Sequence, residues 1–381
     1  MDEVHDVAVV GAGPAGAAAA LRVLQLAPGS RVLLLDAADF PRDKTCGDGI
    51  AAPVFDLLDA LGVPGLDALA PPVPRLRLRT PSGRMVDRVC ARPSHVIPRE
   101  VFDAALVAAA VQRGAQLRRH RVRGLEVRAD RVVLDGRFAA ATVVGADGAN
   151  STVRRLLGAP PTPPASVAVA IRGYAPTTPD PAALTIEYAE GAYPAYAWSF
   201  PLADGGANVG YGVFDRRGSA TRQEFLTMLR RLLPGQEPDP DTVRGHHLPL
   251  STGPRFQPDG RVLLVGDAAA AINPLTGEGI YDAVASGALA GRAALLGAGA
   301  GAAHRAAMAR TFGHHHRHTG VMARLAARPR FLDAAISAAA AHATVFDAAV
   351  DLGLARGTVP PAALGLVLAH LAKPRFVRAR P

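Results

Sequence analysis

Cys46 lies in the segment FPRDKTCGDGI, residues 40–50, between Lys44 and two glycines. A thiol in this setting could ligate a metal, form a disulfide, act as a catalytic group, or be a small residue in a loop against a flat surface. No C-x-x-C pair or His/Cys ligand set accompanies it, so we expect no metal site. A disulfide with Cys90, the only other cysteine, would need a Cα separation below about 7 Å and an oxidising compartment, and this cysteine usage fits a reducing cytosol better.

The run HHHRH at residues 314–318 is a second group of potential metal ligands. Consecutive histidines in a helix point around its axis rather than toward one ion, and no set of carboxylates accompanies them. We therefore expect a solvated basic face here and no metal.

The segment GAGPAG, residues 11–16, matches the G-x-G-x-x-G fingerprint of dinucleotide binding. Apolar runs at residues 4–10 and 31–36 predict two buried parallel strands, and residues 17–27 predict the helix between them. Gly11 permits the tight turn, Gly13 lets the backbone approach a pyrophosphate, and Gly16 lets helix and strand pack closely. The helix N-terminus would then face the anion.

Asp36 follows Gly16 by 20 residues, where an acidic side chain can hold a ribose hydroxyl. Ala12 and Ala15 belong to the same turn and are expected to contact the cofactor with it. Together these features predict a Rossmann-type nucleotide site.

Two later turns have the same character. VVGADGANSTVRR ends a predicted strand at Asp147, which could contact the cofactor or simply cap the turn. LLVGDAAAAINPLTGEGI closes another apolar strand at Gly266 and Asp267 and opens a helix at Gly277 and Gly279.

The composition limits the partners of the chain. Of 381 residues, 49% are hydrophobic and 20% are charged, so the chain can bury a sizeable core. The formal net charge is +9, and almost all of the basic residues are arginine. No basic run is interleaved with aromatic residues, so we expect no nucleic-acid partner. The positive net charge remains compatible with binding to an anionic membrane surface, an acidic carrier protein or a cofactor phosphate. Without an uninterrupted apolar stretch of about 18 residues, we expect a cytoplasmic protein that could touch a membrane to collect lipid.

The predicted fold class is α/β, with an inserted antiparallel-sheet substrate domain and a helical C-terminal tail. Residues 1–165 and 255–300 are assigned to the nucleotide-binding domain, with 73–90 forming a hairpin that contributes to the substrate domain. Residues 166–254 are assigned to the antiparallel sheet, with a covering helix near TRQEFLTMLRRLL, and residues 301–381 to the helical region.

The segment AYAWSFP predicts a strand with Tyr196, Trp198 and Phe200 on one face, because side chains alternate along a strand. Only 5% of the residues are aromatic. Three rings in one place therefore favour the lining of an apolar substrate pocket over ordinary core.

The order of these parts resembles the flavoprotein hydroxylase superfamily. Aromatic hydroxylases usually carry a histidine after G-D-A-A and a G-Q-G-x-N helix start, whereas this chain has Ala270 and a G-E-G-I start. The segments K-x-C-G at 44–47, G-E-G-I at 277–280 and Y-x-W-x-F-P at 196–201 are similar to those of the geranylgeranyl reductase family. The resemblance extends over the whole chain.

The resemblance implies FAD as resident cofactor and NAD(P)H as the external electron donor. Lys44, Cys46 and Gly47 would then lie beside the flavin ring, Asp267 near the ribityl hydroxyls, and Arg99 near the pyrophosphate. Val122 would contact the adenine through its backbone. The remaining expected contacts are the turn residues Asp147, Gly266, Gly277 and Gly279 and the helix residue Ile280. A helix starting there would direct several free N–H groups at the flavin and stabilise its reduced form.

The expected activity is reduction of a carbon–carbon double bond in an apolar prenyl-type or polyene substrate, by hydride transfer from reduced flavin. A nearby acid or water would supply the proton. Cys46, Tyr196 and Trp198 are the candidate catalytic residues. Lys44 could lower the pKa of the Cys46 thiol, or Cys46 could be only a small residue. A flavin monooxygenase, and a flavin-binding cyclase or isomerase without net redox chemistry, are the alternatives.

Overall fold

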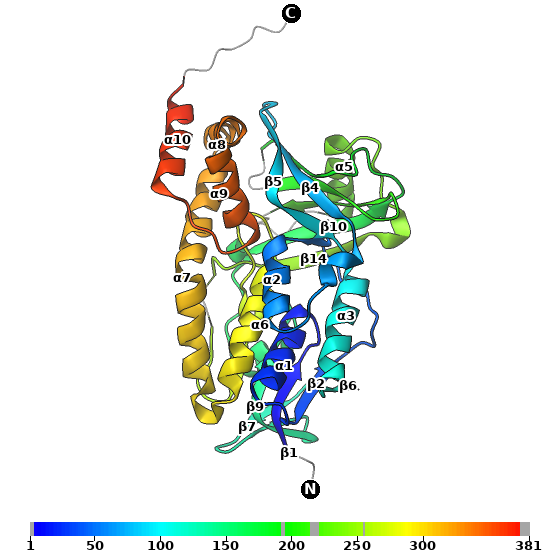
Figure 1. The fold of residues 1–381 in the computed structure, drawn as a ribbon, viewed down its shortest axis with the longest axis vertical. Helices are drawn as coiled ribbons and strands as arrows, with labels where there is room; N and C mark the ends of the chain where they lie inside the picture. The colour runs from blue at the N-terminus through cyan, green and yellow to red at the C-terminus, as the bar shows by residue number, and fades with distance from the viewer. Residues whose placement is uncertain (1–3, 192–194, 214–220, 254–255, 374–381) are drawn as a thin grey trace, which may run out of the picture.

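The computed structural model describes residues 4–191, 195–213, 221–253 and 256–373. Residues 374–381, the end of the expected helical region, and short parts of the region expected to form the antiparallel sheet lie outside the described residues. Figure 1 shows two sheets, one above the other, with a layer of helices along one side.

The first sheet has the strand order β6-β2-β1-β9-β8-β7, and β15 pairs with β9. Except for the edge strand β6, its parallel strands are largely apolar, and their side chains alternate between two hydrophobic cores on the two faces of the sheet. They are β1 Val4–Val10, β2 Val32–Asp36, β6 Gln116–Arg119, β9 Phe138–Gly145 and β15 Val262–Leu264, and the antiparallel edge is β7 Leu125–Val127 and β8 Val132–Leu134. The predicted strands at 4–10 and 31–36 are confirmed as a parallel pair.

Helix α1 (Pro14–Leu26) and helix α6 (Ile280–Ala294) pack with their backbones almost in contact. A Cβ on Gly287 would lie 2.1 Å from the carbonyl oxygen of Ala15, and one on Gly291 would lie 2.4 Å from that of Ala19. Only glycine permits this approach, so α6 is fixed directly against α1. The other helices of this part are α2 Ala52–Ala60, α3 Arg99–Gln112 and α4 Thr152–Leu156.

The second sheet has the order β14-β10-β13-β12-β11-β4-β5-β3. Its strands are β3 Gly49–Ile50, β4 Pro72–Arg79, β5 Met85–Val96, β10 Val167–Ala175, β11 Ala183–Tyr188, β12 Ala195–Pro201, β13 Ala207–Val213 and β14 Arg244–Pro249. All pairs are antiparallel except β4 with β11, which joins two segments about a hundred residues apart in a parallel ladder.

The two faces of the second sheet are covered differently. Helix α5 (Arg222–Leu232) packs on one face through Phe225 and Leu229, and Thr221 and Glu224 form a capping box at its start. Helices α7 (Ala300–Ala326), α8 (Pro329–Ala341), α9 (Ala343–Leu354) and α10 (Pro361–Ala372) form a second layer, in which α8–α10 share a core with β4, β5 and β11. No helix within the described ranges is long and apolar enough to cross a membrane.

The prediction of a solvated basic face at residues 314–318 is wrong. His315 and His316 are 1% and 6% exposed, because α7 packs against α6 and against the segment that joins α9 to α10. Nδ1 of His315 lies 2.9 Å from the carbonyl oxygen of Gly357, and Nε2 of His316 lies 3.4 Å from Oδ2 of Asp282. Within the run, His314 and Arg317 remain exposed.

Candidate flavin and substrate site

A cavity of about 740 Å³ begins at the carboxyl ends of the parallel strands and continues between the second sheet and helices α8–α10. Binding at this edge of a parallel sheet follows from its topology, because the strand-to-helix turns meet there. Every site residue predicted from the sequence lines this cavity except Ala12 and Gly16, which are buried in the glycine turn, and Gly266, which is buried beside α6.

The glycine turn has the geometry that nucleotide binding requires. Gly11 has φ of +100°, and a Cβ there would lie 2.3 Å from the carbonyl oxygen of Ala146. A Cβ on Gly16 would lie 1.8 Å from the carbonyl oxygen of Gly11. The nearest atom to a Cβ on Gly13 would be Nη2 of Arg42 at 3.5 Å, an ordinary contact, and Gly13 is open to the cavity that it lines. The backbone N–H of Ala12 donates to Asp36 at 2.8 Å, which holds the acidic residue beside the turn.

Two arginines lie beside Gly13. Arg99 is buried and makes a bidentate pair with Asp103, at 2.6 and 2.8 Å. Burial alone would lower the pKa of Arg99, but the charge and hydrogen bonds of Asp103 raise it, so the guanidinium stays charged. Nη1 of Arg42 lies 3.3 Å from the same carboxylate. Arg42 was missed because it lies in an irregular loop, where the sequence pattern gives no direction for its side chain. Two cations beside an open glycine fit a pyrophosphate.

The far end of this polar region is formed by Asp36, His120, Arg121 and Val122. Val122 is buried, which leaves its backbone as the group able to meet a nucleobase. Asp147 lines the cavity, but its carboxylate caps α4: it accepts from Ser151 Oγ at 2.5 Å and from the N–H groups of Thr152 and Val153 at 2.7 and 3.0 Å. The capping alternative for the Asp147 side chain is therefore confirmed.

Lys44 projects from the loop after β2 into a half-buried polar cluster. Its ammonium nitrogen lies 3.0 Å from Nε2 of His246 on β14 and 3.9 Å from Oδ2 of Asp267. Burial lowers the pKa of Lys44, and Asp267 opposes that shift. His246 was not predicted, because only the folded sheet brings β14 beside this loop.

Cys46 has no disulfide, and its half-buried side chain lines the cavity. Burial raises its pKa, while Arg99 and Lys44 oppose the shift only in part. Lys44 thus acts to lower this pKa, as one of the two alternatives for Cys46 supposed, but desolvation outweighs both neighbouring charges and the net shift is upward.

A buried hydrogen-bond network, which was not predicted from the sequence, holds the loop that carries Cys46 in place. Asp48, with φ of +60°, accepts from the hydroxyl of Tyr174 and from Nδ2 of Asn208, both at 2.8 Å. The same Nδ2 donates to the carbonyl oxygen of Cys46 at 2.8 Å. Burial raises the pKa of Asp48 to about 6, although these hydrogen bonds oppose the shift.

Tyr196, Trp198 and Phe200 form one wall of the cavity, as the period-two pattern predicted. Successive ring centroids are 6.2 and 6.5 Å apart, while the alternate residues Ala195 and Ala197 face the core under α5. Trp198 Nε1 donates to Asn208 Oδ1 at 3.0 Å, and the Tyr196 hydroxyl donates to the carbonyl oxygen of Thr276. Both polar handles are thus engaged by the protein, which leaves the ring surfaces for a ligand.

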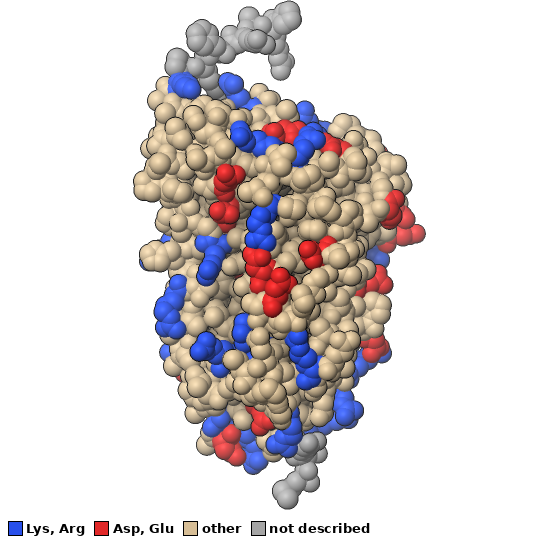
Figure 2. Space-filling view, in the orientation of Figure 1, with Lys and Arg blue, Asp and Glu red and all other residues tan. Residues whose placement is uncertain are grey.

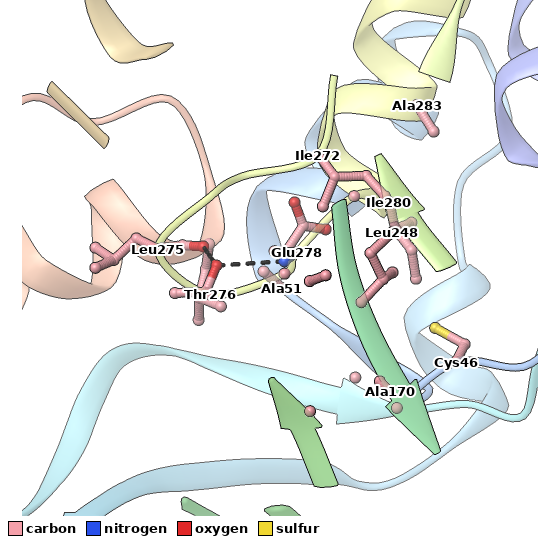
Figure 3. A pocket seen from close by; sticks show the side chains of 18 of the residues that line it. Cys46, Ala51, Ala170, Leu248, Ile272, Leu275, Thr276, Glu278, Ile280 and Ala283 are labelled. Carbon is pink, nitrogen blue, oxygen red and sulfur yellow. Dashed lines mark hydrogen bonds between the residues drawn. The ribbon is translucent and has the colours of Figure 1, made fainter. Parts of the chain in front are cut away.

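The start of α6 differs from the expectation of several free N–H groups. Gly279 is the N-cap and Ile280 the first helical residue, but the N–H of Tyr281 donates to Oε1 of Glu278 at 2.8 Å. Figure 3 shows Glu278 on the pocket wall, with Ile272, Leu248 and Cys46 around the same space. Burial, followed by the charge of Asp282, raises the pKa of Glu278 to about 8. The sequence prediction at the G-E-G-I motif rests on its two glycines, so Glu278 was not predicted as a site residue.

Beyond the aromatic wall the cavity becomes an apolar arm. Its lining comes from the second sheet on one side and from the helical layer on the other: Leu76, Leu78, Leu184, Ile186, Phe331, Leu332, Ile336, Phe346, Leu364 and Val367. Leu364 and Val367 belong to α10, so the arm reaches the last described helix.

Known proteins are similar to this chain in sequence and in fold. The profile of the FAD binding domain family matches residues 4–304. The chain is 35% identical over 324 residues to the menaquinone reductase of Mycolicibacterium smegmatis, with 76% of each chain covered. It is 34% identical over 315 residues to digeranylgeranylglycerophospholipid reductase 1 of Methanopyrus kandleri, covering 76% of this chain and 80% of that one. A geranylgeranyl bacteriochlorophyll reductase-like structure from Thermoplasma acidophilum aligns with a TM-score of 0.81 at 21% identity, covering 98% and 97% of the two chains.

The fold and the nucleotide site therefore define an FAD-binding oxidoreductase. Within that class, the chain belongs to the geranylgeranyl reductase family. The open Gly13, the two arginines and the held Asp36 fit the cofactor that this family binds.

Proposed function

We propose that this protein reduces carbon–carbon double bonds in an apolar, prenyl-type chain. The observation that carries the proposal is that one cavity runs continuously from the glycine turn and Asp36, past the aromatic wall, to the apolar arm. The relatives named for menaquinone and for digeranylgeranylglycerophospholipid reduction support it.

FAD in its reduced form would supply a hydride equivalent. The protein's own contribution is to hold and orient the substrate. The apolar arm excludes water from an isoprenoid chain, and Tyr196, Trp198 and Phe200 present flat surfaces against which a planar double bond can lie. Stabilisation of the bound chain comes from apolar area removed from water, about 25 cal/mol per Å².

The proposed electron donor is NAD(P)H, which the family resemblance implies. Anaerobic mixing of the FAD-loaded protein with NADH and with NADPH, followed by the bleaching of flavin absorbance, tests this step separately from alkene reduction.

We further propose that the protein collects its substrate from an anionic bilayer through α10. The outer side of this helix exposes Leu368 and Leu371, 49% and 38%, and α10 itself contains no Asp, Glu, Lys or Arg. Figure 2 shows a mostly uncharged surface at the upper left, where α8 and α10 lie in Figure 1. Lys373 and three arginines follow α10 in the sequence, a pattern that suits acidic headgroups. The inner side of α10 lines the apolar arm, which offers a short path for a lipid.

The central test is an anaerobic reaction of chemically reduced protein with a menaquinone and with a geranylgeranyl-bearing phospholipid. The expected product carries two additional hydrogens per reduced double bond, measured by mass spectrometry. No saturated product from either substrate would overturn the proposal, as would oxygen incorporation coupled to turnover in air. Product formed with oxidised flavin and no donor would indicate an isomerase or cyclase instead.

A further inference from the structure

We propose that Glu278 is the acid that completes alkene reduction by protonating the second carbon of the double bond. This inference rests on the proposed function. One alkene carbon gains a hydride from reduced FAD and the other gains the carboxyl proton of Glu278. The π bond breaks, FAD is left oxidised, and Glu278 is left as a carboxylate that solvent reprotonates.

Glu278 adjoins the aromatic wall. A Cβ on the preceding Gly277 would lie 3.4 Å from the hydroxyl oxygen of Tyr196, and that hydroxyl donates to the carbonyl oxygen of Thr276. The acid, the wall and the start of α6 therefore form one continuous part of the cavity lining.

The contact with α6 fixes the carboxyl group in place. Tyr281 N–H donates to Oε1 at 2.8 Å, and a protonated carboxyl group still carries a proton that it can donate. A general acid needs this combination of a fixed position and an available proton.

The surroundings of Glu278 keep it protonated near neutral pH. Burial is the largest cause of its pKa of about 8, and the carboxylates of Asp282 on α6 and Asp267 before it add to the shift. Asp282 in turn lies beside His316 of α7. The positive charge of Arg356, from the segment after α9, opposes the rise in the pKa of Tyr281. Among the described residues, no Lys or Arg forms an ion pair with Glu278 that would hold it ionised.

The other carboxylates that line the cavity have partners. Asp36 accepts from Ala12, Asp43 pairs with Arg172, Asp147 caps α4, and Asp267 lies near Lys44. Cys46 is the competing donor, because its raised pKa also keeps a proton on the thiol at neutral pH.

The test compares Glu278→Gln with Cys46→Ser and with Glu190→Gln, a matched change at an exposed acid. Reduced protein is mixed anaerobically with a menaquinone in single turnovers at a series of pH values. For the unchanged protein we expect a rate that falls above pH about 8, where Glu278 ionises. Glu278→Gln should lose this pH limb and react at least about 100-fold more slowly, whereas Glu190→Gln should keep both rate and limb.

A second readout needs neither flavin nor turnover. Infrared spectra of the apoprotein should show a protonated-carboxyl band that titrates near pH 8 and is missing from Glu278→Gln. The proposal is overturned if that band is missing from the unchanged protein at neutral pH, or if Glu278→Gln keeps the rate and the pH limb. Loss of the limb in Cys46→Ser alone would overturn it in favour of the thiol. If the unchanged protein reduces no substrate, the proposed function itself fails, while the infrared titration still reports the state of Glu278.

Discussion

Nζ of Lys44 and Nε2 of His246 lie 3.0 Å apart in a half-buried cluster, although Lys44 belongs to the loop after β2, His246 belongs to β14, and 202 residues separate them. An ammonium group can only donate, so Nε2 of His246 must act as the acceptor and the imidazole must be neutral. Burial, followed by the charge of Lys44, lowers the pKa of His246 to about 4.

This pair predicts a loss of stability in mild acid. The folded pKa of His246 lies below the ordinary value of 6.5, so the unfolded chain takes up the proton first as the pH falls. The contribution of His246 is therefore complete above pH about 6.5 and is lost as the pH falls toward about 4. His246→Gln should reduce this decline in melting temperature by a few degrees. His247→Gln, at the exposed neighbouring position, is the control, and an equal effect of both changes would contradict the prediction.

Gly13 and Gly16 should respond differently to the same substitution. Gly16→Ala places a Cβ 1.8 Å from a backbone oxygen, so we expect the apoprotein itself to be strongly destabilised. Gly13→Ala meets only ordinary contacts from 3.5 Å, so the apoprotein should melt normally while FAD binds at least about tenfold more weakly. Thermal melting and flavin titration check the two effects, and normal FAD affinity in Gly13→Ala would refute the assigned role.

Gly210 lets the indole of Trp198 lie flat over β13. A Cβ on Gly210 would come within 2.1 Å of Trp198 Cζ2, whereas one on Gly212 would find its nearest atom at 3.4 Å. Gly210→Ala should therefore displace the indole and lower alkene reduction by about tenfold or more, with Gly212→Ala as the milder control. Trp198 is the only tryptophan of the chain, so fluorescence reports its displacement directly. Unchanged emission together with unchanged turnover would contradict this account.

Flavin retention should depend more on Asn208 than on the Cys46 thiol. Asn208 is fully buried and donates to the Cys46 carbonyl and the Asp48 carboxylate, so Asn208→Ala leaves buried polar groups unpaired, at a cost of about 1–3 kcal/mol each. We expect Cys46→Ser to retain FAD and Asn208→Ala to lose much of it, measured as flavin absorbance per protein after gel filtration. The reverse order would show that the thiol holds the cofactor.

Membrane contact through α10 should be sensitive to charge. The double change Leu368→Glu and Leu371→Glu should lower co-sedimentation with vesicles containing anionic lipid by about tenfold, because it places two carboxylates on the apolar face. Leu26→Glu, at an exposed leucine of α1, should bind as the unchanged protein does. Equal binding by the double variant would exclude this surface.

The features predictable from the sequence are those with local causes. The glycine turn, the strand before it and Asp36 follow from backbone requirements within a few dozen residues, and Tyr196, Trp198 and Phe200 share a face through simple alternation. The missed features depend on distant segments. Arg42 beside Asp103, the parallel β4–β11 ladder and the burial of His315 and His316 arise only when the chain is packed. Glu278 was missed for another reason: its significance depends on burial, which the motif does not report.

The backbone contact between α1 and α6 also limits how the protein can move. With Gly287 and Gly291 against Ala15 and Ala19, helix α6, which begins two residues after Glu278, cannot slide or tilt without carrying the phosphate turn with it. The glycine turn that contacts the cofactor phosphates and the Glu278 side chain should therefore move as one rigid body. We therefore expect an opening that admits a long substrate to come from the α8–α10 layer, which lines the apolar arm, through collective motion in about the microsecond to millisecond range.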